Sequence, residues 1–343
     1  MFDFWRPYYG HHAVIIFFVL SGYVIAYTVD VKRKNIEYFY LKRLARLWSC
    51  LVPALFLGLV LDSIGSLIDP GLYAGRIYQN DSIFIRFIAN LFFFQELWFL
   101  DVRYLSNGPM WSLGYEFWYY VMFSLLMYVE SLKKKYILML FAVLIIGPKI
   151  LMYFPLWFAG VLLYRINKKE LLNKNAGLNL FLSLIPVFVY FYLSEANIFA
   201  LADEVSRNIL NKLGGYTDYT WSKDFLSDYL VGLLFVLHLL WLYKYAVHKR
   251  KGYMIKEVIV KLVTHFSGAT LSIYLYHFPL LMFFKALQNA DIITYKSVSI
   301  LALLVILSAY SLSFVTESRK NSYFDFLMKL KNSLSKNKIH NNS

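Results

Sequence analysis

Long apolar runs recur along nearly the whole chain and constrain its fold more than any other feature. A helix needs roughly 20 apolar residues to cross a bilayer, where every backbone polar group must be paired within the protein. We expect spans at residues 12–30, 48–65, 109–129, 136–153, 154–166, 178–194, 229–245, 268–287 and 298–316. The sequence therefore predicts an all-α fold, a polytopic transmembrane helical bundle with about nine to ten spans.

The composition agrees with this class. Apolar residues make up 59% of the chain and charged residues 16%, and the mean hydropathy is +0.51, too apolar for a water-soluble domain. The net charge of +14 comes from short basic clusters between the apolar runs, a pattern that orients a membrane protein rather than binding nucleic acid. The single cysteine, Cys50, excludes an intramolecular disulfide and suggests no redox chemistry.

The charge map also predicts the orientation. Basic residues are enriched in cytoplasmic loops, so residues 32–46, 133–135, 165–174, 244–251 and 329–338 should lie inside. The acidic loops at 62–81 and 195–228 should lie outside. The two assignments agree if the apolar stretch 83–100 is interfacial or re-entrant.

Three segments follow from this map. Residues 1–11 should form a short extracytoplasmic N-terminus, residues 12–316 one membrane domain, and residues 317–343 a basic cytoplasmic tail. The end of that tail, residues 329–343, has the polar composition of a disordered segment that touches anionic headgroups.

Ionisable groups inside spans are costly and are the first functional candidates. Ser112 and Glu116 lie four residues apart on one helix face, and Trp111 adds an aromatic surface beside them. Glu116 can act as a base or hold a cation. A structural ion pair beneath an interfacial aromatic belt explains the same residues about as well.

A second candidate is His277, which follows Tyr274 in an apolar run and precedes Pro279. A histidine titrates near neutral pH and serves as a general base, and Pro279 can kink the helix and free a carbonyl. A hydrogen-bonded packing role is the commoner one for a lone histidine. We interpret His238 as structural.

Arg43 and Arg46 lie three residues apart on a helix next to the membrane, with Lys42 beside them. Paired guanidinium groups suit the phosphates of a donor from the cytosol, although anchoring to headgroups also explains basic residues here.

Near the start of the chain, the small residues Ser21 and Gly22 favour close helix packing. His11 and His12 lack the carboxylate or cysteine neighbours of a metal site.

Five segments together resemble the acyltransferase-3 family, and the resemblance runs from about Gly10 to Glu317. They are FFVLSGYVIAY (17–27), YLKRLARLW (40–48), GPMWSLGYEFWYY (108–120), FPLWFAGVLLY (154–164) and LSIYLYHFPLL (271–281). Members of this family are multi-spanning membrane proteins, most of them O-acyltransferases that modify carbohydrates of the cell envelope or secreted products.

The resemblance implies roles for individual residues. Arg43 and Arg46 match the family's basic pair, which implies acyl-CoA, usually acetyl-CoA, as a co-substrate and no permanently bound cofactor. Glu116 and His277 match the acidic and histidine positions of two further segments, which implies a catalytic polar centre. We expect Trp111, Ser112 and Tyr274 to contact the substrate there.

The chain departs from the family at its beginning. Members usually start with a further span that carries an arginine or lysine and, about three turns later, a histidine thought to be catalytic. Arg6 with His11 or His12 does not reproduce that spacing. We expect the sequence to begin inside a longer protein or to be a natural truncation, and the base to be His277, Glu116 or a relocated histidine.

The resemblance implies an integral protein of the bacterial cytoplasmic membrane that O-acetylates or otherwise acylates a polysaccharide, with the bilayer, the donor and a carbohydrate acceptor as partners. Two alternatives stay open, a transporter of a polysaccharide or lipid-linked glycan and an inactive truncated member of the family. A transporter more often has inverted repeats or paired broken helices, which are not visible in this sequence.

Overall fold

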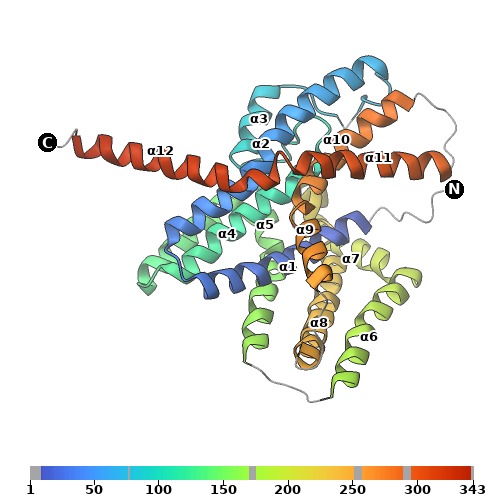
Figure 1. The fold of residues 1–343 in the computed structure, drawn as a ribbon. Coiled ribbons are helices and arrows are strands. Elements are labelled where there is room, and N and C mark those ends of the chain that lie inside the picture. The colour runs from blue at the N-terminus through green and yellow to red at the C-terminus, as the bar shows by residue number, and fades with distance from the viewer. Residues whose placement is uncertain (1–8, 76–77, 170–174, 251–256, 289–294, 341–343) are drawn as a thin grey trace. The chain divides into compact units, whose positions relative to one another are not determined.

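The structure is a computed structural model that describes residues 9–75, 78–169, 175–250, 257–288 and 295–340. These residues form helices joined by turns and loops, with no β-strand among them (Figure 1). The α-helices are α1 (Tyr9–Lys32), α2 (Ile36–Ile68), α3 (Ile83–Leu91), α4 (Trp111–Tyr128), α5 (Leu132–Lys168), α6 (Ala176–Glu195), α7 (Ile198–Lys212), α8 (Phe225–Arg250), α9 (Glu257–Ser267), α10 (Thr270–Gln288), α11 (Tyr295–Ser313) and α12 (Lys320–His340). The 3-10 helices are η1 (Gly108–Met110), η2 (Tyr216–Ser222) and η3 (Glu317–Arg319).

Seven helical stretches in these described ranges are long and apolar enough to cross a bilayer. They are α1, α2, α5, α6, α10 and the stretches Tyr216–Val247 and Ser297–Leu334. The prediction of an all-α, polytopic membrane fold is therefore confirmed, whereas the predicted count of nine to ten spans is not. The spans expected at 136–153 and 154–166 account for part of the difference, because α5 covers both.

The expected boundary between those two spans is wrong, and the reason is local. The helical backbone is broken at Gly147, before residue 153, where φ is 74° and ψ is −178°. Glycine adopts a positive φ without the steric cost that a side chain brings, and Pro148 beside it cannot donate a backbone hydrogen bond. The Gly-Pro pair therefore determines where α5 changes direction.

The chain divides into two compact units. Unit 1 comprises Met1–Lys34, Leu97–Leu100 and Val121–Glu257, and unit 2 comprises Asn35–Glu96, Asp101–Tyr120 and Val258–Ser343. In unit 1, α1 packs against α5 and α8, and α6 and α7 pack against α8. A Cβ atom added at Gly22 would lie 2.0 Å from the Trp157 carbonyl oxygen, which confirms the close packing predicted from Ser21 and Gly22.

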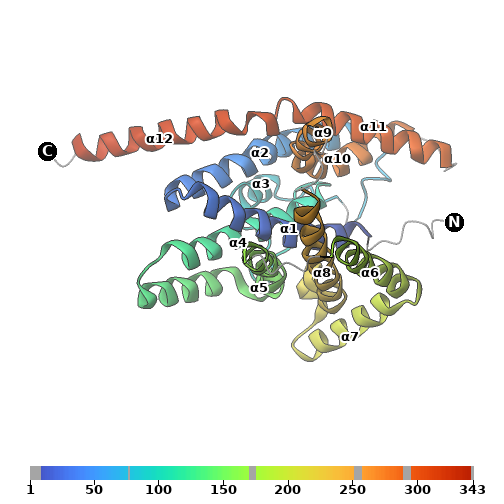
Figure 2. The same cartoon turned by 60° about the horizontal axis from the view of Figure 1, so that its bottom comes forward.

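In unit 2, α2 packs against α10 and α12, and α10 packs against α11. Figure 2 shows α12 extending along α2 as a continuous helix. Lys42 Nζ donates to Asn321 Oδ1 at 2.7 Å, and the Tyr38 and Phe324 rings meet edge to face. The prediction of disorder from residue 329 is therefore wrong as far as His340, because α12 is helical to that residue and packs against α2 through its first half.

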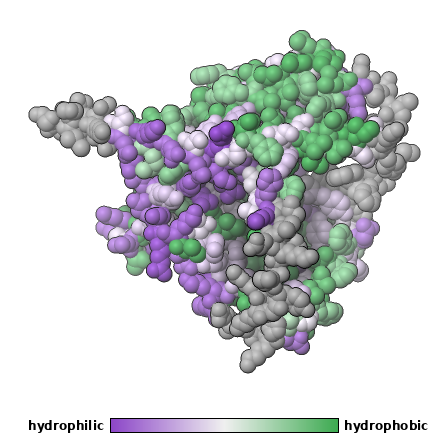
Figure 3. Space-filling view, in the orientation of Figure 1, coloured by the Kyte–Doolittle hydropathy of each residue, from purple (hydrophilic) through white to green (hydrophobic). Residues whose placement is uncertain are grey.

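The stretch expected at 83–100 to be interfacial or re-entrant begins with α3, a helix of nine residues. A helix this short spans less than half of the bilayer core. Its apolar face continues on α2, where Figure 3 shows a broad hydrophobic surface over both helices. Phe56, Val60, Phe84 and Ile85 are among the exposed apolar side chains there, as expected for a surface that contacts lipid.

Candidate active site

The arginine pair predicted to bind a phosphorylated donor lies on the second and third turns of α2, in unit 2. Asn35 caps this helix, since its Oδ1 accepts a hydrogen bond from the Tyr38 backbone N–H at 3.0 Å. Arg43 and Arg46 share one helix face and are both half-buried. The Nε atom of Arg43 is buried and has no hydrogen-bond partner among the described residues.

A carboxylate from α4 compensates these charges. Glu116 is 2% exposed, and the Tyr120 hydroxyl one turn later donates to its carboxylate. Both arginines interact electrostatically with Glu116 and with Tyr120. The structure thus brings together Arg43, Arg46 and Glu116, three of the predicted site residues. A carboxylate that interacts electrostatically with two guanidinium groups can orient them, which differs from the role of a general base.

The start of α4 is fixed by a buried polar contact with the far half of α2. Asp62 is fully buried and accepts hydrogen bonds from the Ser106 backbone N–H and from Ser106 Oγ, both at 2.9 Å. Ser106 lies two residues before η1, which leads directly into α4. Asp62 therefore helps to set the position from which Ser112 and Glu116 project.

Ser112 and Tyr274, which we expected to contact the substrate, lie against each other. Ser112 Oγ donates to the Tyr274 hydroxyl at 2.9 Å, and that hydroxyl donates to the Pro109 carbonyl at 2.9 Å. Tyr274 also interacts electrostatically with Glu116. Trp111 is 5% exposed and packs edge to face against Tyr115 with ring centroids 5.0 Å apart. The hydrogen bond between Ser112 and Tyr274 thus connects α4 to α10, near Glu116 and the two arginines.

His277 is half-buried on α10, one turn after Tyr274. Its Nδ1 lies 2.5 Å from the Tyr274 carbonyl oxygen, so Nδ1 carries the proton of the neutral ring and Nε2 is the basic nitrogen. The carbonyl that Pro279 frees in this helix is that of Leu275, and Asn107 Nδ2 donates to it at 2.9 Å. The predicted release of a carbonyl by Pro279 is therefore confirmed, and it ties α10 to the loop before η1.

Sequence reasoning missed Glu317. This carboxylate is 1% exposed and accepts hydrogen bonds from the Ser272 backbone N–H at 3.1 Å and from Ser272 Oγ at 3.2 Å. It also interacts electrostatically with Arg46. We assigned residues 317–343 to a basic cytoplasmic tail because the last apolar run ends at residue 316, and we gave Glu317 no role. The signal that was available is a single carboxylate directly beside Thr316 at the end of that run.

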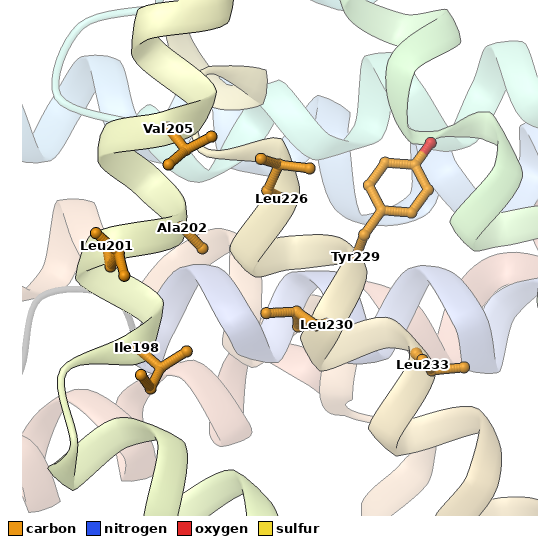
Figure 4. Close-up of a pocket in the computed structure, with 8 residues that line it drawn as sticks. All are labelled: Ile198, Leu201, Ala202, Val205, Leu226, Tyr229, Leu230 and Leu233. Atoms are coloured by element: carbon orange, nitrogen blue, oxygen red, sulfur yellow. The ribbon is translucent and has the colours of Figure 1, made fainter.

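Unit 1 contains an open groove that is unsuited to this chemistry. It has a volume of 570 Å³ and lies between α7 and α8. Figure 4 shows Ile198, Leu201 and Val205 of α7 facing Leu226 and Leu230 of α8. Its lining is almost entirely hydrocarbon. The hydroxyl of Tyr229, on α8, donates to the Met152 carbonyl oxygen at 2.6 Å. His238, in the same unit, lies with Nδ1 2.8 Å from the Ser183 carbonyl oxygen.

Together, the fold and the cluster in unit 2 define an integral membrane protein with two arginines and two carboxylates held among its helices. A family model described as an acyltransferase domain matches residues 2–317. The chain therefore belongs to the acyltransferase-3 family.

A curated relative is similar over a shorter region. Acyltransferase MdmB of Streptomyces mycarofaciens is 31% identical over 119 residues, which cover 34% of this chain and 28% of the relative. No solved structure matches the chain.

Proposed function

We propose that this chain is a membrane O-acyltransferase. It transfers an acyl group, in the usual case acetyl, from acyl-CoA to a hydroxyl group of a cell-surface or exported carbohydrate, in the cytoplasmic membrane of a bacterium. Family membership supports acyl transfer in general. The observation that carries the proposal is the arginine pair with its buried carboxylate, which supports a donor rich in phosphate.

The donor binds through Arg43 and Arg46. Planar guanidinium groups form paired, charge-assisted hydrogen bonds with phosphate oxygens, and the unpartnered Nε of Arg43 supplies one such donor group. Glu116 and Tyr120 hold the two side chains in place, so little side-chain entropy is lost when the donor binds.

The acceptor binds beside Ser112 and Tyr274, whose hydroxyl groups suit hydrogen bonding to a sugar, with Trp111 packed next to them. In the reaction, the acceptor oxygen attacks the thioester carbon, a C–O bond forms and the C–S bond breaks. The proton of the acceptor hydroxyl ends on the coenzyme A thiol. We retain His277 Nε2 and Glu116 as groups of this polar centre that contact the reactants.

The test uses membranes that contain the protein, labelled acetyl-CoA and a glycan acceptor, with acylated glycan detected by mass spectrometry. Replacing both arginines (Arg43→Ala with Arg46→Ala) should raise the donor KM at least tenfold. The loss of one hydrogen bond to a charged group costs about 1.5 to 3 kcal/mol, which corresponds to roughly 10-fold to 150-fold in affinity.

Lys42→Ala is the matched control, since it removes a neighbouring positive charge whose side chain bonds to α12. It should leave the donor KM within about twofold. An unchanged KM in the double variant would contradict donor binding by the arginines. Movement of labelled glycan across the membrane without any acyl transfer would instead support the transporter alternative.

A further inference from the structure

One buried carboxylate near the arginine pair has no role in the proposed function. Glu317 begins η3, the short helix between α11 and α12, and it is 1% exposed. Thr316, directly before it, is buried as well. Burying a charged group in a membrane protein is costly, so such a group is a functional candidate.

The first turn of α10 holds this carboxylate. Glu317 Oε2 accepts hydrogen bonds from the Ser272 backbone N–H at 3.1 Å and from Ser272 Oγ at 3.2 Å. The N-terminus of a helix favours a negative charge, because its first backbone N–H groups have no partner within the helix. The contact therefore stabilises α10 and fixes where the carboxylate lies. It does not by itself require a charged acid, since an amide oxygen can accept the same two hydrogen bonds.

Ser272 also places the carboxylate against the face of α2 that carries Arg46. Cys50 lies four residues after Arg46 and so on the same helix face. The Cys50 Sγ atom is 3.5 Å from Ser272 Oγ, and the Tyr276 hydroxyl, one turn further along α10, donates to the Cys50 carbonyl oxygen at 3.1 Å. Both η3 and α10 pack against α2. These contacts all lie within unit 2, and they bring Glu317 to the α2 face of the arginine pair.

The charge of Glu317 acts on Arg46. The two groups interact electrostatically, as Arg46 and Glu116 also do. Glu317 interacts more weakly with Lys320. Carboxylates from α4 and from η3 thus act on one guanidinium group, which has five N–H donors to share between them and a ligand. A side chain restrained in this way loses less conformational entropy when it binds a phosphate.

We propose that Glu317 is a positioning residue of the donor site, which holds the Arg46 guanidinium group in the orientation that the phosphates of the acyl donor need, an inference that rests on the proposed function. The carboxylate does not contact the donor, because it is buried and its charge repels phosphate. It acts through Arg46. Its charge should therefore matter only for a donor that carries phosphate groups.

The test compares Glu317→Gln with the wild type in membranes that are supplied with a glycan acceptor. The amide oxygen can accept both hydrogen bonds from Ser272, so the substitution removes the charge and keeps the contact with α10. Ordering an unrestrained arginine side chain costs roughly tenfold in affinity, so KM for acetyl-CoA should rise about tenfold with kcat within about twofold. For S-acetylpantetheine, which has the thioester without the phosphates, kcat/KM should stay within about twofold of the wild-type value.

A double variant gives a second readout that needs only acetyl-CoA. Once Arg46→Ala has removed the guanidinium group, the addition of Glu317→Gln should raise KM by no more than about twofold further. Glu37→Gln is the matched control, because it makes the same change at a half-exposed carboxylate of α2 that pairs with Lys331. Its KM for acetyl-CoA should stay within about twofold of the wild-type value.

Three results would overturn the proposal. They are an unchanged KM for acetyl-CoA in Glu317→Gln, an equal loss of kcat/KM with both donors, and a further rise of about tenfold in the double variant. An unchanged KM together with a lower unfolding temperature in detergent would show that Glu317 only stabilises α10. The proposed function still stands in these cases if Arg43→Ala with Arg46→Ala raises the donor KM. If wild-type membranes transfer no acyl group, the proposed function and this inference both fall.

Discussion

The contact between α1 and α5 makes a sharp prediction about two glycines. A Cβ atom at Gly22 would lie 2.0 Å from the Trp157 carbonyl oxygen, and one at Gly160 would lie 1.9 Å from the Val19 carbonyl oxygen. Carbon and oxygen atoms approach to about 3.3 Å at the closest, so either alanine forces the helices apart by more than about 1 Å. Both obstacles are backbone atoms, which cannot rotate away as a side chain can.

Overpacking of this kind costs about 1 to 3 kcal/mol, and separation also weakens the remaining contacts between the helices. Gly22→Ala and Gly160→Ala should therefore each lower stability by about 2 kcal/mol. Gly58→Ala is the control, because a Cβ atom there meets nothing within 4 Å. It should be neutral or stabilising by up to about 1 kcal/mol, the difference in helix propensity between glycine and alanine.

The assay is unfolding of the purified protein in mixed micelles with increasing SDS, followed by tryptophan fluorescence. Gly22→Ala and Gly160→Ala should unfold at a lower SDS fraction than the wild type, whereas Gly58→Ala should unfold at the same or a higher fraction. If Gly160→Ala is as stable as the wild type, the helices are not in backbone contact and this account of unit 1 is refuted.

Three further predictions concern single side chains. Glu116→Gln should raise the donor KM about tenfold or more, as measured in the membrane assay, because Arg43 and Arg46 lose the carboxylate that orients them. Burial raises the pKa of Asp203, on α7, from 3.8 to about 6, so the folded state favours the protonated acid. The unfolding temperature should therefore fall as the pH rises from about 4 to 6, and the unfolding temperature of Asp203→Asn should not show this dependence on pH. Asn35→Ala should cost about 1 kcal/mol in thermal unfolding, because it removes the side-chain cap of α2 while leaving its packing face intact.

Much of the fold follows from the apolar runs and the small residues among them. The run around Ser21 and Gly22 predicted both a span and a close helix contact, and both appear in α1. Periodicity could not locate the break in α5, because the apolar pattern continues through Gly147 and Pro148 and the break depends on backbone conformation. The helix α12 was missed for a different reason, since its polar sequence is stabilised by packing on α2 and not by its own composition.

The candidate site was predictable where chemistry and spacing agree. Helical geometry places Arg43 and Arg46 on one face of α2, and it places Ser112 and Glu116 on one face of α4. Pairing between distant segments was not predictable, because it depends on how the helices pack. Ser112 and Tyr274 are 162 residues apart in sequence, and nothing local in either segment indicates that they meet.

The most direct test of the central claim is the stoichiometry of the reaction in proteoliposomes that contain the purified chain. With acetyl-CoA and a glycan acceptor, the account predicts one acetyl ester on the glycan for each thiol released, with both products absent when the acceptor is left out. Thiol release without an ester would show hydrolysis in place of transfer. If neither product forms while the protein remains folded, the chain does not carry out acyl transfer and the account is contradicted.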